Sequence, residues 1–384
     1  MLKNIQIAFL ALLVVVGVYG VEAQTRCGVL PPLEKAAPES PSVAELDAKI
    51  KALSQRLKLE PKNQTLFYER GRLYAKTGVF DEAIRDFTQT IEINPAHFMA
   101  YLERGNVYSE LKDSNAAILD FSKVIEISPM YEGGYNNRGI AYSDKRDYDA
   151  AIVDLNKAIE IDPKYALGYY NRGVHYSKAK DYDAAMRDLN KSIEFDSGYA
   201  AAFRVRSRLL WERKQYPGAI MDATKAIELK QDDPKGYVSR ATACTSSGNH
   251  NGAIRDANRA LELNSKYADA FIVRGLIYLD KKDFDAAIRD QTKALELDPQ
   301  SAAAYTNRGL AWRQKRNYDT ALLDSMRAVE LAPEDGDVYF NRGLVYLDRK
   351  DYGFAIQDFD KAIELNPKDV NARKMRDRAQ KEAL

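Results

Sequence analysis

Residues 135–163 read YNNRGIAYSDKRDYDAAIVDLNKAIEIDP, and they define the unit from which the chain is built. Tyr135, Gly139 and Tyr142 stand at i, i+4 and i+7, a spacing that predicts one apolar face of a helix. Asp147 supplies the side-chain acceptor that begins a second helix. The proline that closes the stretch ends this helix, because proline lacks the N–H group and clashes with the preceding turn. The stretch therefore predicts a hairpin of two antiparallel helices.

The same pattern recurs at i+34 along most of the chain, without an insertion or a deletion. Its marker is an arginine found at nine positions: Arg70, Arg104, Arg138, Arg172, Arg206, Arg240, Arg274, Arg308 and Arg342. Such an array buries its core between neighbouring repeats, so a chain of 384 residues needs no single large core. We therefore expect an all-α solenoid of nine repeats over residues 64–369. The predicted repeats are 64–97, 98–131, 132–165, 166–199, 200–233, 234–267, 268–301, 302–335 and 336–369.

Two positions hold small residues in every repeat. The position after the arginine is glycine in seven repeats, and Ser207 and Ala241 replace it in the other two. A position in the second helix is alanine in all nine: Ala83, Ala117, Ala151, Ala185, Ala219, Ala253, Ala287, Ala321 and Ala355. Helices approach closely only where side chains are nearly absent, and large aromatic residues such as Tyr101 and Phe271 fill the remaining space. These positions predict close packing within each hairpin.

An aspartate stands at i+16 from each of the nine arginines: Asp86, Asp120, Asp154, Asp188, Asp222, Asp256, Asp290, Asp324 and Asp358. Residues at this separation face each other across an antiparallel hairpin, so we expect an ion pair between the two helices of every repeat. A set of acid catalysts or metal ligands is the alternative, but a chemical site would not be copied identically into nine repeats. The pairs would fix the register of the hairpin and add little net stability, because desolvation opposes their attraction.

This pattern resembles the tetratricopeptide repeat (TPR) family. The family signature combines an aromatic residue, Leu-Gly, Tyr, Ala, Phe and Pro at fixed offsets, and the last repeat matches it at Tyr339, Gly343, Tyr346, Ala355, Phe359 and Pro367. One departure is systematic, because arginine replaces the leucine in all nine repeats. The resemblance implies a right-handed superhelical solenoid that binds a peptide or a partner protein in its concave groove.

Both ends of the array are predicted to carry a capping helix. Residues 42–63 end in phase with the later repeats at Pro61, and they resemble the second helix of a degenerate repeat. Residues 370–384 form a charged segment with one weakly apolar side, typical of the helix that closes such arrays.

Residues 1–23 predict a cleaved secretory signal. Lys3 precedes an apolar run from Ile5 to Val18, and small or short apolar residues precede a cleavage site after Ala23. An uncleaved membrane anchor is the alternative, although the apolar run is shorter than the roughly 20 residues that cross a bilayer. The sequence therefore predicts a periplasmic or secreted protein.

Residues 24–41 contain four prolines and are predicted to form an exposed linker. Membrane association is expected only if the signal stays uncleaved or Cys27 is lipidated, and the residues before Cys27 are not the small apolar run typical of lipidation. Cys244 occupies a buried aromatic position of the sixth repeat. We expect a packed thiol there rather than a disulfide with Cys27, although export would permit the bridge.

The charge balance argues against a general electrostatic partner. The chain has 57 Lys and Arg against 56 Asp and Glu, so no overall basic field predicts binding to nucleic acid or an anionic membrane. The three histidines are dispersed, and His175 occupies a position that is Ala141 one repeat earlier, which indicates helix packing. We therefore expect no metal, no cofactor and no catalytic triad.

The residues one, five and eight positions after the aromatic anchor of each first helix form a stripe, which the family resemblance places along the concave groove. The predicted partner-binding residues are Arg204, Arg208, Trp211, Ile272, Leu276, Leu279, Leu310, Arg313, Phe340, Leu344 and Leu347. An apolar trough that leads to a basic spot favours a peptide site. The alternative is that these residues pack against neighbouring repeats or an end helix.

The best-known ligand mode of the family, a clamp of Lys and Asn for two carboxylates, is not reproduced. Asn106 and Asn136 lie in the stripe, but the matching lysines are absent. We therefore expect a non-enzymatic scaffold for a protein or peptide ligand outside the cytoplasm. The alternative function is an accessory subunit of an envelope enzyme or of a secretion or assembly complex.

Overall fold

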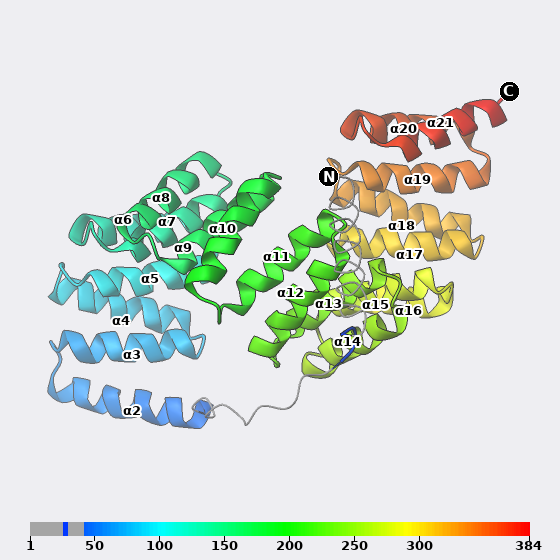
Figure 1. Cartoon of the computed structure of the whole chain (residues 1–384). Coiled ribbons are helices and arrows are strands. Elements are labelled where there is room, and N and C mark those ends of the chain that lie inside the picture. The colour runs from blue at the N-terminus through cyan, green and yellow to red at the C-terminus, as the bar shows by residue number, and fades with distance from the viewer. Residues whose placement is uncertain (1–25, 30–41) are drawn as a thin grey trace, which may run out of the picture. The chain divides into compact units, whose positions relative to one another are not determined.

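The structure, a computed structural model, describes residues 26–29 and 42–384. The described part is all-α, and its 20 helices follow one another as hairpins (Figure 1), which confirms the predicted fold class. The first helices of the repeats are α3 (Gln64–Lys76), α5 (Phe98–Glu110), α7 (Glu132–Asp144), α9 (Ala166–Lys178), α11 (Ala200–Glu212), α13 (Pro234–Ser246), α15 (Ala268–Asp280), α17 (Ala302–Gln314) and α19 (Gly336–Arg349). The second helices are α4 (Phe80–Ile93), α6 (Ser114–Ile127), α8 (Tyr148–Ile161), α10 (Tyr182–Phe195), α12 (Tyr216–Leu229), α14 (His250–Leu263), α16 (Phe284–Leu297), α18 (Tyr318–Leu331) and α20 (Tyr352–Leu365). Helices α2 (Val43–Leu59) and α21 (Val370–Glu382) stand at the two ends.

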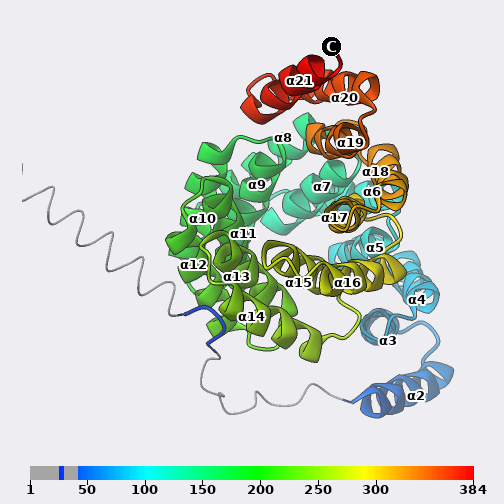
Figure 2. The same cartoon turned by 90° about the vertical axis from the view of Figure 1, so that its right-hand side faces the viewer.

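The described residues form two compact bodies. The N-terminal body comprises residues 42–205, and the C-terminal body comprises residues 206–384 together with residues 26–29. The border between them falls within α11. Within each body successive hairpins stack on one another, as Figure 2 shows for α15 to α21.

Close packing within the hairpins is confirmed. A Cβ atom added to Gly71 would lie 2.9 Å from Cε1 of Phe87, and one added to Gly105 would lie 2.7 Å from Cε1 of Phe121. The alanine position of the second helix is fully buried in all nine repeats. A larger side chain at either position would push the two helices apart.

All nine Arg–Asp pairs form as predicted. In each pair Nε and Nη2 of the arginine donate to the two carboxylate oxygens at 2.7 to 2.9 Å, a bidentate geometry. All nine aspartates are buried. The pairs therefore fix the register between the first and the second helix of each hairpin.

Burial raises the pKa of Asp86 and of Asp256, even though each carboxylate accepts two bonds from its arginine. A carboxyl group with a raised pKa stabilises the folded state at low pH, and this contribution is lost as the pH rises through the folded pKa. At neutral pH the ionisation of these two aspartates therefore opposes folding. This direction agrees with pairs that specify register more than they add stability.

The third nitrogen of the arginine makes a contact that the sequence interpretation missed. In most repeats Nη1 donates to a side chain at i−16, in the second helix of the preceding repeat. The acceptors are Ser54, Thr88, Ser122, Asn156, Thr224, Asn258 and Thr292, at 2.7 to 3.4 Å. Each of these arginines thus joins three helices and fixes the stacking of repeats as well as their internal register. The signal was present as a Ser, Thr or Asn at the second position after most of the aspartates.

The turn inside each hairpin contains one residue in the left-handed conformation. This position is occupied by Gly78, Lys112, Arg146, Lys180, Lys214, Gly248, Lys282, Arg316 and Lys350. In the third repeat the N–H groups of Arg146 and Asp147 donate to the carbonyls of Ser143 and Tyr142, at 3.1 and 2.9 Å, and so cap the first helix. A basic side chain at this helix end suits the helix dipole, but a Cβ atom makes the backbone conformation unfavourable.

Replacing Arg146 by glycine is expected to raise the free energy of unfolding by about 1 kcal/mol, because glycine adopts positive φ without steric strain. Urea unfolding followed by circular dichroism measures the change. Gly78→Lys is the matched variant and should shift the midpoint in the opposite direction. A lower midpoint for Arg146→Gly would mean that the charge at the helix end outweighs the backbone strain.

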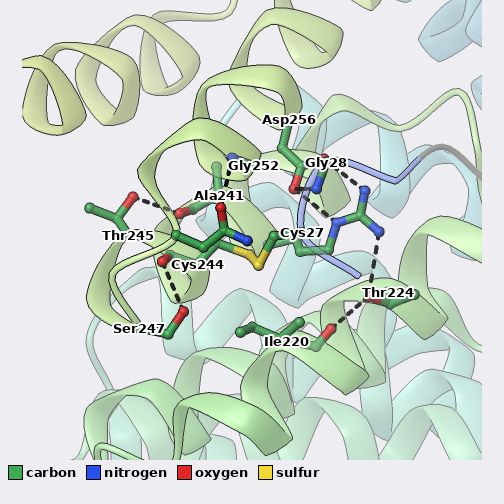
Figure 3. Close-up of a disulfide and its surroundings, with 12 residues drawn as sticks. Cys27, Gly28, Ile220, Thr224, Ala241, Cys244, Thr245, Ser247, Gly252 and Asp256 are labelled. Atoms are coloured by element: carbon green, nitrogen blue, oxygen red, sulfur yellow. Dashed lines mark hydrogen bonds and ion pairs between the residues drawn. A yellow bond between two sulfur atoms is a disulfide. The ribbon is translucent and has the colours of Figure 1, made fainter. Parts of the chain in front are cut away.

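The prediction of a packed thiol at Cys244 is wrong, because Cys244 forms a disulfide with Cys27 (Figure 3). The two Cα atoms are 6.0 Å apart, and both side chains are buried. The short segment around Cys27 lies on α13 and α14: the N–H group of Gly28 donates to Oδ2 of Asp256 at 3.0 Å, and Nη2 of Arg240 donates to the carbonyl of Val29 at 2.7 Å. The bridge consumes the thiol that a lipid anchor on Cys27 would need.

Small residues of the sixth repeat explain this docking. Cys244 stands where most repeats carry a bulky aromatic residue, and Gly252 faces the segment from α14. A Cβ atom added to Gly252 would lie 2.5 Å from Cβ of Cys27, so a larger residue would exclude the segment. Of the described residues 26–29, Cys27 is buried and Gly28 is half-buried, whereas Val29 is 53% exposed. The remaining residues of 24–41, and the signal predicted in residues 1–23, lie outside the described part. Each helix in the described part is too short or too polar to span a membrane.

Candidate partner-binding surface

The apolar part of the predicted stripe divides into two regions. In α15 and α17, Leu276 is 37% exposed, and Leu310 and Leu279 are half-buried. Ile272 packs against the buried cluster of Ala294, Leu295 and Ala304, so only part of it remains available. Helices α15 and α17 contact each other, which places Leu276 and Leu310 at equivalent positions of neighbouring first helices.

The predicted binding residues in α19 pack largely within the fold. Leu347 is 3% exposed and shares a cluster with Ala379 of α21, and Phe340 and Leu344 pack against that cluster. This is the end-helix packing that the sequence left open as an alternative. The part of the apolar stripe that faces solvent is therefore shorter than the sequence suggested.

Two stripe residues connect neighbouring repeats through polar contacts. Nε of Arg313 donates to Oδ2 of Asp348 at 2.7 Å, and Nε1 of Trp211 donates to Oγ of Ser246 at 2.7 Å. Both contacts run from the eighth position after the anchor to the next first helix. Trp211 also packs against the cluster around the disulfide. These side chains support the stacking of first helices.

The predicted basic spot lies on α11, where the border of the two bodies falls. Arg204 belongs to the N-terminal body and is half-buried, whereas Arg208 belongs to the C-terminal body and is exposed. Arg208 shares its body with Leu276 and Leu310.

Asparagines of the N-terminal body form a ladder that the sequence did not reveal. Nδ2 of Asn137 donates to Oδ1 of Asn106, Nδ2 of Asn136 donates to Oδ1 of Asn137, and Nδ2 of Asn171 donates to Oδ1 of Asn136, at 2.8 to 3.0 Å. Asn136 is fully buried. The ladder links α5, α7 and α9, so Asn106 and Asn136 serve packing between repeats rather than a carboxylate clamp.

His175 occupies the packing position that the sequence predicts. It is 7% exposed, its ring meets the ring of Tyr148 edge to face, and burial lowers its pKa. Among the described residues no group of three His, Cys, Asp or Glu side chains is arranged to hold a metal ion.

Comparison with protein families assigns this fold. Models described as "Tetratricopeptide repeat" match residues 68–131, 134–165, 166–199 and 336–369, and a model described as "TPR repeat" matches residues 275–315. The chain belongs to the tetratricopeptide repeat family. TPR arrays generally serve as scaffolds for interactions between proteins and are typically non-enzymatic.

Three solved structures are similar to this chain at low sequence identity. The Cut9–Hcn1 hetero-tetramer of the APC/C contains a chain that is 17% identical, with a TM-score of 0.59 over 86% of this TPR chain and 81% of that chain. MamA is 22% identical, with a TM-score of 0.37 over 41% and 97% of the two chains. A thermophilic TPR protein of Thermus thermophilus is 18% identical, with a TM-score of 0.45 over 47% and 98%. A comparison with curated proteins gives no match.

Proposed function

We propose that this TPR protein is a non-enzymatic scaffold that holds a peptide segment of a partner protein along α15 and α17. The observation that carries this proposal is the pair Leu276 and Leu310, which occupy equivalent positions of contacting first helices and lie outside the cluster under α21. Apolar contacts there would supply most of the affinity. The exposed Arg208 in the same body would select a ligand with an acidic end.

The proposal places the protein outside the cytoplasm. The Cys27–Cys244 disulfide supports this location, because structural disulfides persist in oxidising compartments. The charged start, the apolar run and the small residues before Gln24 are consistent with a cleaved signal. Protein purified from the envelope or the medium should therefore begin at Gln24 in N-terminal sequencing.

Leu276→Asp is expected to weaken partner binding by about 30-fold or more, because a charge in the centre of an apolar contact loses the energy of a hot spot. A photo-crosslinker at residue 310 would first capture the partner, and its affinity for each variant would then be measured with purified proteins. Leu323→Asp is the matched control, since Leu323 is 69% exposed on α18 of the same body. Equal affinities of the parent chain, Leu276→Asp and the control would move the site elsewhere.

A further inference from the structure

Helix α2 takes the place of a second helix in a repeat whose first helix is not part of residues 42–384. Nη1 of Arg70 donates to Oγ of Ser54 in α2 at 2.9 Å, just as Nη1 of Arg104 donates to Oγ1 of Thr88 in α4 at 2.9 Å. Ser54 stands one full repeat period before Thr88, so α2 and α4 are in register. The face of α2 that corresponds to the hairpin interface of a complete repeat can therefore be identified residue by residue.

That face of α2 is exposed where its equivalents are buried. Lys49 stands at the position of Ala83, which is 0% exposed, as is the equivalent alanine of every repeat. Leu53 stands at the position of Phe87, which is fully buried against Gly71. Lys49 is exposed and Leu53 is only half-buried, because none of the described helices packs on them as α3 packs on α4.

Leu73 of α3, across the groove from α2, is also more exposed than its equivalents in the later repeats. Its equivalents in all later first helices of the repeats are at most 7% exposed: Val107, Ala141, His175, Leu209, Ala243, Ile277, Ala311 and Val345. Val107 clusters with Ala83 and Phe87 of the preceding hairpin. Among the described helices, α2 alone precedes the helix of Leu73, and Leu73 stays half-buried.

The result is a groove of about 750 Å³ between α2 and α3. Its apolar lining comprises Ala52, Leu53, Leu73 and Ala75. Its charged lining comprises four cations and two carboxylates: Lys49, Arg56, Arg72, Lys76, Glu69 and Glu103. All of these residues belong to the N-terminal body.

Cations dominate the charge at this groove. Arg72 pairs with Glu103 at 3.4 Å, and Arg56 lies 3.9 Å from Glu60 on its own helix. Lys49 and Lys76 have no ion-pair partner among the described residues. A ligand for this groove must combine an apolar face with acidic flanks.

We propose that this groove binds one acidic amphipathic helix of a partner protein, which occupies the place that a first helix takes in a complete repeat. Small and apolar residues of that helix would cover Leu53 and Leu73, and its carboxylates would face Lys49 and Lys76. In α2, Ala52 stands at the position that the paired aspartate occupies in the repeats. The bound helix would therefore not need the arginine that marks the repeats of this chain. This site lies in the N-terminal body and goes beyond the stripe on α15 and α17.

Charge favours such a partner over a second copy of this chain. The obvious candidate from a second copy is α21, which is in register with the first helices of the repeats, with Arg376 at the position of Arg342. On its equivalent face Arg376 pairs with Asp360 and Asp377, whereas Arg373 would meet Lys49 and the other cations of the groove. Like charges in contact disfavour that assembly.

A fluorescein-labelled helical peptide of about 14 residues tests the proposal on the full chain. It carries Leu and Ala at i, i+4 and i+7 with Glu at the flanking positions, and a matched peptide carries Lys in place of Glu. Fluorescence anisotropy is expected to show saturable binding of the acidic peptide and at least about tenfold weaker binding of the basic one. The double variant Lys49→Glu/Lys76→Glu should lower the affinity for the acidic peptide by about tenfold, because it reverses both unpaired charges.

Two control variants make the test specific. Lys51→Glu/Lys58→Glu makes the same charge change on exposed residues of α2 that do not line the groove, and it should leave binding unchanged. Leu276→Asp should also bind the peptide normally, so failure of this proposal is distinguishable from failure of the α15–α17 site. Equal binding of both peptides, or an unaffected Lys49→Glu/Lys76→Glu variant, would overturn the proposal. The proposal would also be overturned if the chain self-associates in sedimentation experiments and Lys49→Glu/Lys76→Glu abolishes this self-association.

Discussion

Replacing Arg240 by methionine is expected to lower the free energy of unfolding by about 3 to 5 kcal/mol, because it leaves the charge of Asp256 buried without its two guanidinium donors. Asp256 is 0% exposed and the Arg240 side chain is 1% exposed, so water cannot replace the lost bonds. The N–H group of Gly28 still donates to Asp256, but one neutral donor does not compensate a buried carboxylate.

A double-mutant cycle measures this coupling by urea unfolding. Arg240→Met/Asp256→Leu should recover much of the loss, because a well-packed apolar pair replaces the ion pair without a buried charge. Arg138→Met is the comparison within the same array: the side chain of Arg138 is 22% exposed, so its loss should be smaller. Additive effects of the two substitutions at 240 and 256 would show that the residues are not coupled.

Removing the Cys27–Cys244 disulfide is expected to lower the stability of the C-terminal body by about 2 to 5 kcal/mol, since the bridge restricts a loop with a sequence separation of 217 residues. Thermal unfolding with and without dithiothreitol measures this effect. The parent chain should melt at a lower temperature in the reductant. Cys27→Ser/Cys244→Ser should melt at the lower temperature under both conditions.

The reductant experiment also tests the docking of residues 26–29. These residues contribute Gly28 and Val29 to the contacts of Arg240 and Asp256, so reduction should weaken the same region that Arg240→Met affects. The decrease in the free energy of unfolding caused by Arg240→Met is therefore expected to differ between the protein with the disulfide and the protein without it. Identical melting curves of the parent chain with and without reductant would show that the bridge does not support the fold.

The architecture of this protein is readable from its amino-acid sequence, down to individual contacts within a hairpin. The constant period, the glycine and alanine positions and the aspartate at i+16 from each arginine were enough to predict an all-α array and nine ion pairs. These features are readable because a solenoid repeats one local interface, and each side chain that matters lies within two helices of its partner. Because the pattern recurs nine times, each repeat supports the interpretation of the others.

The contacts outside the repeating pattern depend on the arrangement of the chain in space. The docking of Cys27 on Cys244 joins residues far apart in the sequence, and the two small residues that admit it differ from their equivalents in most other repeats. The cover that α21 gives to Leu347, and the half-buried state of Leu73 among the described residues, depend on which helix stands next to an end of the array. The exposure of a side chain is a property of its neighbours in space, and at a terminus or at a docked segment no preceding repeat predicts those neighbours. The groove between α2 and α3 lies at one of these non-repeating places.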